Sequence, residues 1–130
     1  MTQIYQKNIP IIKTTGEDLK IRMREYVVLH VLKHHRNLPA VTEARNSHQW
    51  KQIIEPPANK RTLGIMGLGN LGLDCAITLK NLGFKGNGWS NSKKNIDGIN
   101  TFTGEKELTK FLKQVDILVC MLPLTPKTRG

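Results

Sequence analysis

The stretch that decides the fold reads Thr62-Leu63-Gly64-Ile65-Met66-Gly67-Leu68-Gly69-Asn70-Leu71-Gly72. Its first five residues form a short apolar run, typical of a strand buried on both faces of a parallel sheet. The Gly-x-Gly-x-x-Gly spacing comes next and opens segment 70–81, which predicts a helix. A strand that runs through three such glycines into a helix is typical of a Rossmann-type dinucleotide-binding domain.

Each glycine has its own expected role in this turn. Gly67 allows the tight turn, Gly69 lets a pyrophosphate approach the backbone, and Gly72 lets the helix pack closely against the strand. The free N–H groups of Asn70 and Leu71 at the helix start are expected to point at the anion. The alternative is a glycine-rich turn without a ligand. The strand before the turn and the helix after it favour dinucleotide binding.

The segments around the turn alternate between strand and helix. Strands are predicted over 84–89, 99–102 and 117–122, and a helix over 104–113. This alternation predicts an α/β fold, namely the first half of a Rossmann-type parallel sheet with strand order 3-2-1-4. The residues expected to face inward from the two helices are Leu73, Ile77 and Leu82, and then Leu108, Phe111 and Leu112.

A long helix over 17–37 is predicted upstream of the sheet. Thr14-Thr15 favours a helix start, and Leu19, Met23, Val27 and Val31 recur at helical spacing. Further apolar residues at 28, 29 and 32 predict that the helix is covered on more than one side. Pro39 is expected to end it, and a second short helix is expected over 41–46.

Composition narrows the class of protein. The net charge of +10 suggests nucleic acid as a partner, but residues 1–75 hold eleven Lys/Arg and six Asp/Glu, and residues 76–130 hold nine and four. Because the charge is spread and few aromatic residues accompany it, we expect no nucleic-acid partner. There is no apolar run of about 20 residues and no signal-peptide pattern, so we expect no membrane association and a cytoplasmic location. Cys75 and Cys120 are expected to be buried structural thiols.

The end of the second strand bears on the choice of cofactor. An NAD-selective site would place an acid there for the ribose 2′-hydroxyl, but no acid occurs between residues 84 and 96. The two hydroxyls and two lysines in this segment suit a 2′-phosphate, which favours NADP over NAD, with NAD still possible. The alternative is that the lysines are merely solvated. The residues concerned are Ser90, Asn91, Ser92 and Lys93.

No catalytic or metal motif stands out. His30 and His34 lie one helical turn apart, but no third ligand accompanies them, so no metal site is predicted and surface or interface histidines are expected. No nucleophile motif was found either.

Beyond these patterns, the sequence resembles the D-isomer-specific 2-hydroxyacid dehydrogenase family, most closely its glyoxylate/hydroxypyruvate reductase A group. The resemblance covers nearly the whole chain from Ile9 on. It is carried by residues 22–36, Ser47-His48-Gln49-Trp50, residues 63–72, Gly88-Trp89-Ser90 and Leu122-Pro123-Leu124-Thr125-Pro126-x-Thr128.

The resemblance implies an NAD(P)H-dependent reductase of small 2-oxo acids, with this chain an internal fragment of it. Residues 1–16 would be a remnant of the substrate domain, 17–60 an interdomain and dimerisation helix with a linker, and 61–130 the first half of the nucleotide-binding domain. A homodimer would form through the helix at 17–37, and Leu122 and Pro123 would line the adenine side of the cofactor pocket.

The same resemblance leaves the chain without assigned catalytic residues. The family's substrate-binding Arg and its His–Glu pair lie beyond residue 130, so no turnover is expected of this chain alone. Gly86 and Asn91 also depart from the family pattern, because a β-branched residue and an Arg are usual there. Two alternatives therefore stay open: a non-catalytic dinucleotide-binding module, and a dimerising interaction protein that binds no nucleotide.

Overall fold

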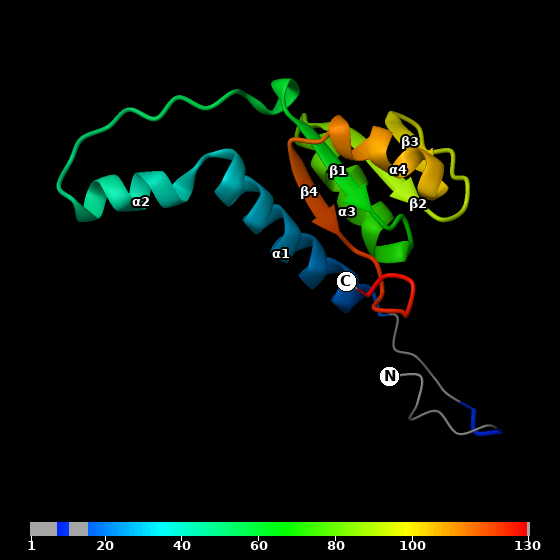
Figure 1. Ribbon diagram of the computed structural model, residues 1–130. Coiled ribbons are helices and arrows are strands. Elements are labelled where there is room, and N and C mark those ends of the chain that lie inside the picture. Colours follow the sequence, from blue (N-terminus) through cyan, green and yellow to red (C-terminus); the bar gives the residue numbers. More distant parts are fainter. Residues whose placement is uncertain (1–7, 11–15, 130) are drawn as a thin grey trace.

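The computed structural model describes residues 8–10 and 16–129 (Figure 1). The predicted helix start at Thr14-Thr15 therefore lies outside the described residues. None of the helices in the described ranges is long and apolar enough to span a membrane.

Four parallel strands form the sheet, in the predicted order (Figure 1). They are β1 (Thr62–Met66), β2 (Lys85–Ser90), β3 (Ile99–Thr103) and β4 (Ile117–Cys120), arranged β3-β2-β1-β4. The start of β4 is fixed to the start of β1, because the Thr62 amide donates to the Asp116 carboxylate at 2.8 Å and the Asp116 amide donates to the Thr62 carbonyl at 2.9 Å. β4 ends earlier than predicted, before the chain turns at residue 123.

The helices also follow the predictions, with one shifted boundary. α1 (Glu17–His35) precedes α2 (Leu38–Asn46), and Asn37 separates them in a left-handed conformation with φ 53°. Pro39 therefore lies in the first turn of α2, where a missing N–H costs little, instead of ending α1. The remaining helices are a 3₁₀ turn, η2 (Ala58–Lys60), then α3 (Asn70–Asn81) and α4 (Gly104–Lys113).

The core consists of one apolar cluster on each face of the sheet. Leu63 and Ile65 of β1 belong to the cluster that includes α1 and α3, whereas Met66 packs with the aromatic cluster of Trp89, Phe102 and Phe111. The alternation along β1 explains this division, because successive side chains of a strand point to opposite faces. A parallel strand covered on both faces is what its apolar run predicted.

Two predictions about inward-facing residues were wrong. Leu73 is half-buried, and Ile77 and Leu82 are exposed; α3 instead packs inward through the small or apolar residues Gly72, Cys75, Ala76 and Leu79. On α4, Phe111 is fully buried but Leu112 is 42% exposed. In both helices the sheet covers only one face, and the longest apolar side chains do not all lie on it.

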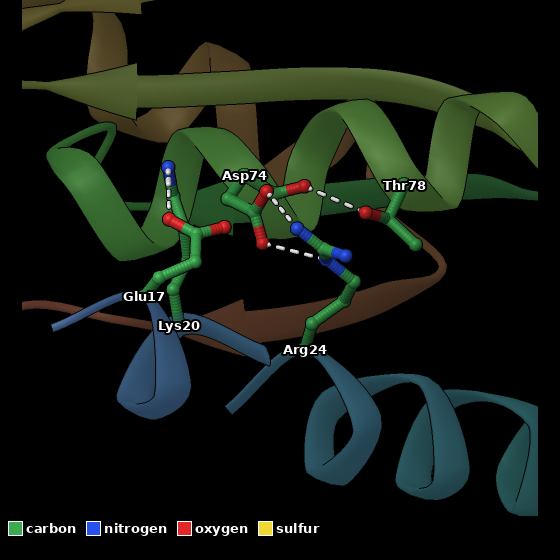
Figure 2. A network of polar contacts seen from close by, with 5 residues as sticks. All are labelled: Glu17, Lys20, Arg24, Asp74 and Thr78. Carbon is green, nitrogen blue, oxygen red and sulfur yellow. Dashed lines mark hydrogen bonds and ion pairs between the residues drawn. The ribbon is translucent and has the colours of Figure 1, made fainter. Parts of the chain in front are cut away.

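α1 packs on α3 through the cluster that contains Met23, Val27 and Val31, and its last residue, His35, packs against Phe84. Its other side is not covered by the described chain, since Leu29 is 62% exposed. The prediction of a helix covered on more than one side is therefore not met within this chain. Arg24 and Asp74 tie α1 to α3 in a polar network (Figure 2).

The prediction for the cysteines was right for only one of them. Cys75 is buried in α3, and burial raises the pKa of its thiol. Cys120 is exposed, because β4 lies at the edge of the sheet and alternate residues of this strand face outward.

Candidate functional site

The glycine turn between β1 and α3 has the geometry that its three glycines predicted. Gly67 has φ +98°, and a side chain there would lie 3.0 Å from the carbonyl group of Met121. A Cβ at Gly72 would collide with the carbonyl oxygen of Gly67, so only glycine lets α3 approach the turn. At Gly69 a Cβ would meet nothing within 4 Å. Only Gly69 therefore faces open space, as a residue beside a ligand should.

The first turn of α3 offers free donors next to that space. Its first intrahelical hydrogen bond runs from the Leu73 amide to the Gly69 carbonyl at 2.8 Å, so the amides of Asn70, Leu71 and Gly72 precede the hydrogen-bonded ladder. No acidic side chain occupies this turn. The positive end of the helix is thus available to an anion such as a pyrophosphate.

A cleft of about 600 Å³ opens at the carboxyl ends of β1, β2 and β4. In open parallel sheets this edge is where ligands bind. The strand ends contribute Met66, Trp89 and Cys120, and the loops and α4 contribute Asn91, Glu105, Leu108, Leu122, Lys127 and Thr128. The apolar side chains give a surface for a flat ring, and the polar ones lie where they can contact a sugar or phosphate.

The last residue of β2 and the loop after it carry the four residues that were predicted near the cofactor's 2′-phosphate. Ser90 is buried, and its hydroxyl donates to the Ser92 carbonyl at 2.6 Å, which fixes the loop. Asn91 is exposed and lines the cleft. Ser92 and Lys93 are exposed but are not part of the lining. The loop thus brings one of the four residues, Asn91, into the cleft and leaves two more at the surface beside it.

A tight turn over 123–128 closes the other side of the cleft. The Thr128 hydroxyl donates to the Pro123 carbonyl at 2.7 Å and accepts from the Thr125 amide at 2.8 Å. Leu122, predicted to line the adenine side, lies in the cleft, whereas Pro123 is exposed and outside the lining. Pro123 therefore contributes a carbonyl that holds the turn.

Of the residues that line the cleft, sequence reasoning predicted only Asn91 and Leu122, and the polar residues that it missed are Glu105, Lys127 and Thr128. A signal was available for Glu105, because only Gly104 separates it from the end of β3, so it lies near the carboxyl edge of the sheet. Thr128 belongs to the motif that carried the family resemblance, and Lys127 occupies the unspecified position of that motif, but nothing in their spacing placed them in one cleft with Asn91.

The histidines lie away from this cleft. His30 and His34 line a shallow apolar groove of about 220 Å³ between α1 and β4. His35 is buried against Phe84, with ring centroids 4.8 Å apart. Within residues 8–10 and 16–129, no three His, Cys, Asp or Glu side chains gather so that they could hold a metal ion.

The glycine turn, the free first turn of α3 and the cleft together define a dinucleotide-binding domain of the Rossmann type. The sequence model of a protein family, the D-isomer specific 2-hydroxyacid dehydrogenase NAD binding domain, matches residues 28–130 of the chain. The chain therefore belongs to the D-isomer specific 2-hydroxyacid dehydrogenase family, which is a family of enzymes.

Curated relatives show the same kinship. The chain is 32% identical over 122 residues to glyoxylate/hydroxypyruvate reductase A of Yersinia enterocolitica, and 33% identical over 128 residues to that of Citrobacter koseri. These alignments cover 94% and 98% of this chain but 39% and 41% of the relatives. The chain thus spans about two fifths of their length.

Solved structures agree in fold. An NADPH-dependent glyoxylate/hydroxypyruvate reductase from Sinorhizobium meliloti, in complex with NADP and sulfate, superposes with a TM-score of 0.90 at 41% identity, over 95% of this chain and 39% of that one. A probable 2-hydroxyacid dehydrogenase from Rhizobium etli, in complex with NADP, HEPES and L(+)-tartaric acid, gives the same TM-score of 0.90 and 41% identity, over 98% and 40% of the two chains.

Proposed function

We propose that this chain forms the adenosine and pyrophosphate part of an NADP(H)-binding site in a reductase of small 2-oxo acids of the glyoxylate/hydroxypyruvate type. The cofactor would supply the hydride, and this chain's own contribution is to bind and orient it. The observation that carries the proposal is the open space at Gly69 beside the free amides of α3. The NADP complexes of two similar structures support the choice of cofactor.

The arrangement of residues gives each part of the cofactor a place. The pyrophosphate would lie over Gly69 and accept hydrogen bonds from the amides of Asn70 and Leu71. The adenosine would occupy the cleft between Asn91 and Leu122. The exposed Ser92 and Lys93 would stand near the ribose, where a 2′-phosphate needs donors.

We further propose that the chain forms a homodimer through α1. The face of α1 turned away from α3 exposes Tyr26, Leu29 and Leu32. An exposed apolar patch of this kind on one helix is typical of an interaction surface. Sedimentation of the wild type and of Leu29→Arg tests this: we expect a dimer that the variant dissociates, and a monomeric wild type would contradict it.

Binding can be tested without any turnover. We would titrate NADPH and NADH calorimetrically into the wild type and into Gly69→Val, with circular dichroism as the control for folding. Saturable binding of NADPH, weaker binding of NADH, and loss of both in a folded Gly69→Val are expected, because the new side chain would fill the pyrophosphate position.

The other outcomes separate the alternatives. A wild type that dimerises but binds neither nucleotide would contradict the proposal and support an interaction protein. Equal binding by the wild type and Gly69→Val would place the nucleotide away from the glycine turn.

A further inference from the structure

The cofactor cleft contains two charged side chains that no predicted phosphate contact includes. Glu105 comes from the first turn of α4, and Lys127 from the turn over 123–128. Both line the cleft together with Asn91, whose side-chain amide carries no charge. The loop after β2 thus contributes a neutral amide to the lining, and the positive charge in the lining comes from Lys127 of another segment.

We propose that Lys127 is a second specificity-determining cation for the 2′-phosphate in this chain, in addition to Lys93, and that Glu105 opposes it. The proposal rests on the proposed function, since it assumes that the adenosine occupies the cleft. Lys127 would take over, from the opposite wall, the positive charge that Asn91 does not supply. A lysine suits this role because its ammonium group is a point charge on a long stem that reaches a phosphate from a distance.

The backbone that carries Lys127 is well fixed. The Thr128 side chain bonds to the Pro123 carbonyl at 2.7 Å and to the Thr125 amide at 2.8 Å, and the Thr128 amide donates to the Thr125 carbonyl at 3.0 Å. The chain just before this turn is held to β1, because the Met121 amide donates to the Met66 carbonyl at 2.7 Å. The base of the Lys127 side chain is therefore positioned on the cleft wall before any ligand arrives.

Glu105 adds a negative charge to the cleft, so the effect of charge on the affinity for a 2′-phosphate can be tested by removing either the negative or the positive side chain. A carboxylate repels a 2′-phosphate, so its presence weakens the selectivity that a lysine provides. Glu105 and Lys127 are the only charged residues in the lining of this cleft among the described residues. Removing either charge should thus change the affinity for a 2′-phosphate with opposite signs.

The experiment uses two ligands that differ only by the group in question. Adenosine 2′,5′-bisphosphate and adenosine 5′-monophosphate would be titrated into the whole chain, into Lys127→Gln and into Glu105→Gln. Lys106→Gln is the matched control, because Lys106 follows Glu105 on α4 but does not line the cleft. Lys127→Arg keeps the charge and so distinguishes loss of charge from a local change in folding.

We expect Lys127→Gln to lower the affinity for the bisphosphate about tenfold and to leave the affinity for the monophosphate unchanged, because one charge-assisted contact is lost. Glu105→Gln should raise the affinity for the bisphosphate about threefold, and both changes in affinity should become smaller at high salt. Lys127→Arg and Lys106→Gln should behave as the wild type does.

Three results would overturn the inference. Equal weakening of both nucleotides by Lys127→Gln would place Lys127 at another part of the ligand, and no effect on either would remove it from recognition. Both results leave the proposed function standing. A wild type that binds neither nucleotide would overturn the inference and the proposed function together.

Discussion

Arg24 of α1 holds the carboxylate of Asp74 of α3 with two hydrogen bonds, from Nε to Oδ2 at 2.8 Å and from Nη2 to Oδ1 at 2.7 Å (Figure 2). The two residues are fifty positions apart in the chain. This fork-shaped contact fixes α1 against the helix that begins at the glycine turn, and its planar geometry is one that arginine provides and lysine does not.

Removing this contact should destabilise the protein more than removing a surface pair. Asp74→Asn and Arg24→Gln, alone and together, form a double-mutant cycle in urea unfolding. A second cycle on the exposed pair Arg22–Asp18 of α1, with an Nε–Oδ2 distance of 2.7 Å, is the matched control. That pair should contribute almost nothing to the free energy of unfolding. Equal coupling in the two cycles would show that Arg24–Asp74 does not hold the helices together.

Asp74 also predicts a dependence of stability on acid pH. Hydrogen bonding by Arg24 lowers the pKa of the Asp74 carboxyl below its ordinary value of about 3.9. The stability this provides is fully present above that pH and is lost as the pH falls through the lowered pKa. Unfolding measured from about pH 5 to 2 should thus show a smaller loss of stability in Asp74→Asn than in the wild type. Parallel curves for the two proteins would count against this assignment.

His35 predicts a second loss of stability, at milder pH. Burial, and then the nearby Arg61 and Arg36, lower the pKa of His35, while Glu55 raises it. Because the unfolded chain binds this proton more readily, stability is present above about pH 6.5 and falls as the pH drops below it. The Nδ1 atom of His35 is buried and has no hydrogen-bond partner among the residues that the structure describes, in accordance with a neutral ring.

The His35 prediction has a neighbouring control. His35→Leu should flatten the pH dependence of urea unfolding between about pH 7 and 5, whereas His34→Gln, at an exposed position, should leave it unchanged. A dependence that persists in His35→Leu would assign the titration to another group.

Adjacent residues on α4 test the corrected view of its inner face. Phe111 is 0% exposed, and Phe111→Ala should reduce the free energy of unfolding by about 3–5 kcal/mol. Leu112 is 42% exposed, so Leu112→Ala should cost less than about 1 kcal/mol. Similar losses would mean that α4 buries both residues, for instance in an assembly.

The glycines of the turn should separate folding from binding. Gly72→Ala forces a Cβ into the Gly67 carbonyl oxygen and should destabilise the protein by about 1–3 kcal/mol. Gly69→Ala meets no atom within 4 Å, and its φ of −73° is ordinary, so its stability should change by less than about 1 kcal/mol. Thermal unfolding of both variants tests this, and a larger loss in Gly69→Ala would contradict it.

The parts of the fold that depend on a local sequence pattern could be predicted from the sequence. β1, the glycine turn and α3 were found because an apolar run, a fixed glycine spacing and a helical period follow one another within twenty residues. The side of α3 that faces the sheet was predicted wrongly, because Ile77 looks as suitable for burial as Leu79 until the neighbouring elements are placed.

The cleft residues that were not predicted from the sequence were missed for a different reason. Asn91, Glu105 and Lys127 come from three segments and meet only when β2, β3 and β4 end at the same edge of the sheet. Residue type alone gave no reason to single out Glu105 or Lys127 among many charged residues. The strand order was predicted correctly, and it shows at which edge of the sheet the site lies. It does not show which side chains line the cleft at that edge.

In the proposed function, a dinucleotide binds at the carboxyl edge of the sheet, over Gly69. The most direct test is to follow the backbone amide NMR signals of the chain while NADPH is added. We expect saturable shifts at Gly69, Asn70 and Leu71, at residues 90–93, and at residues 122–128. An absence of shifts, or shifts confined to the groove between α1 and β4, would contradict it.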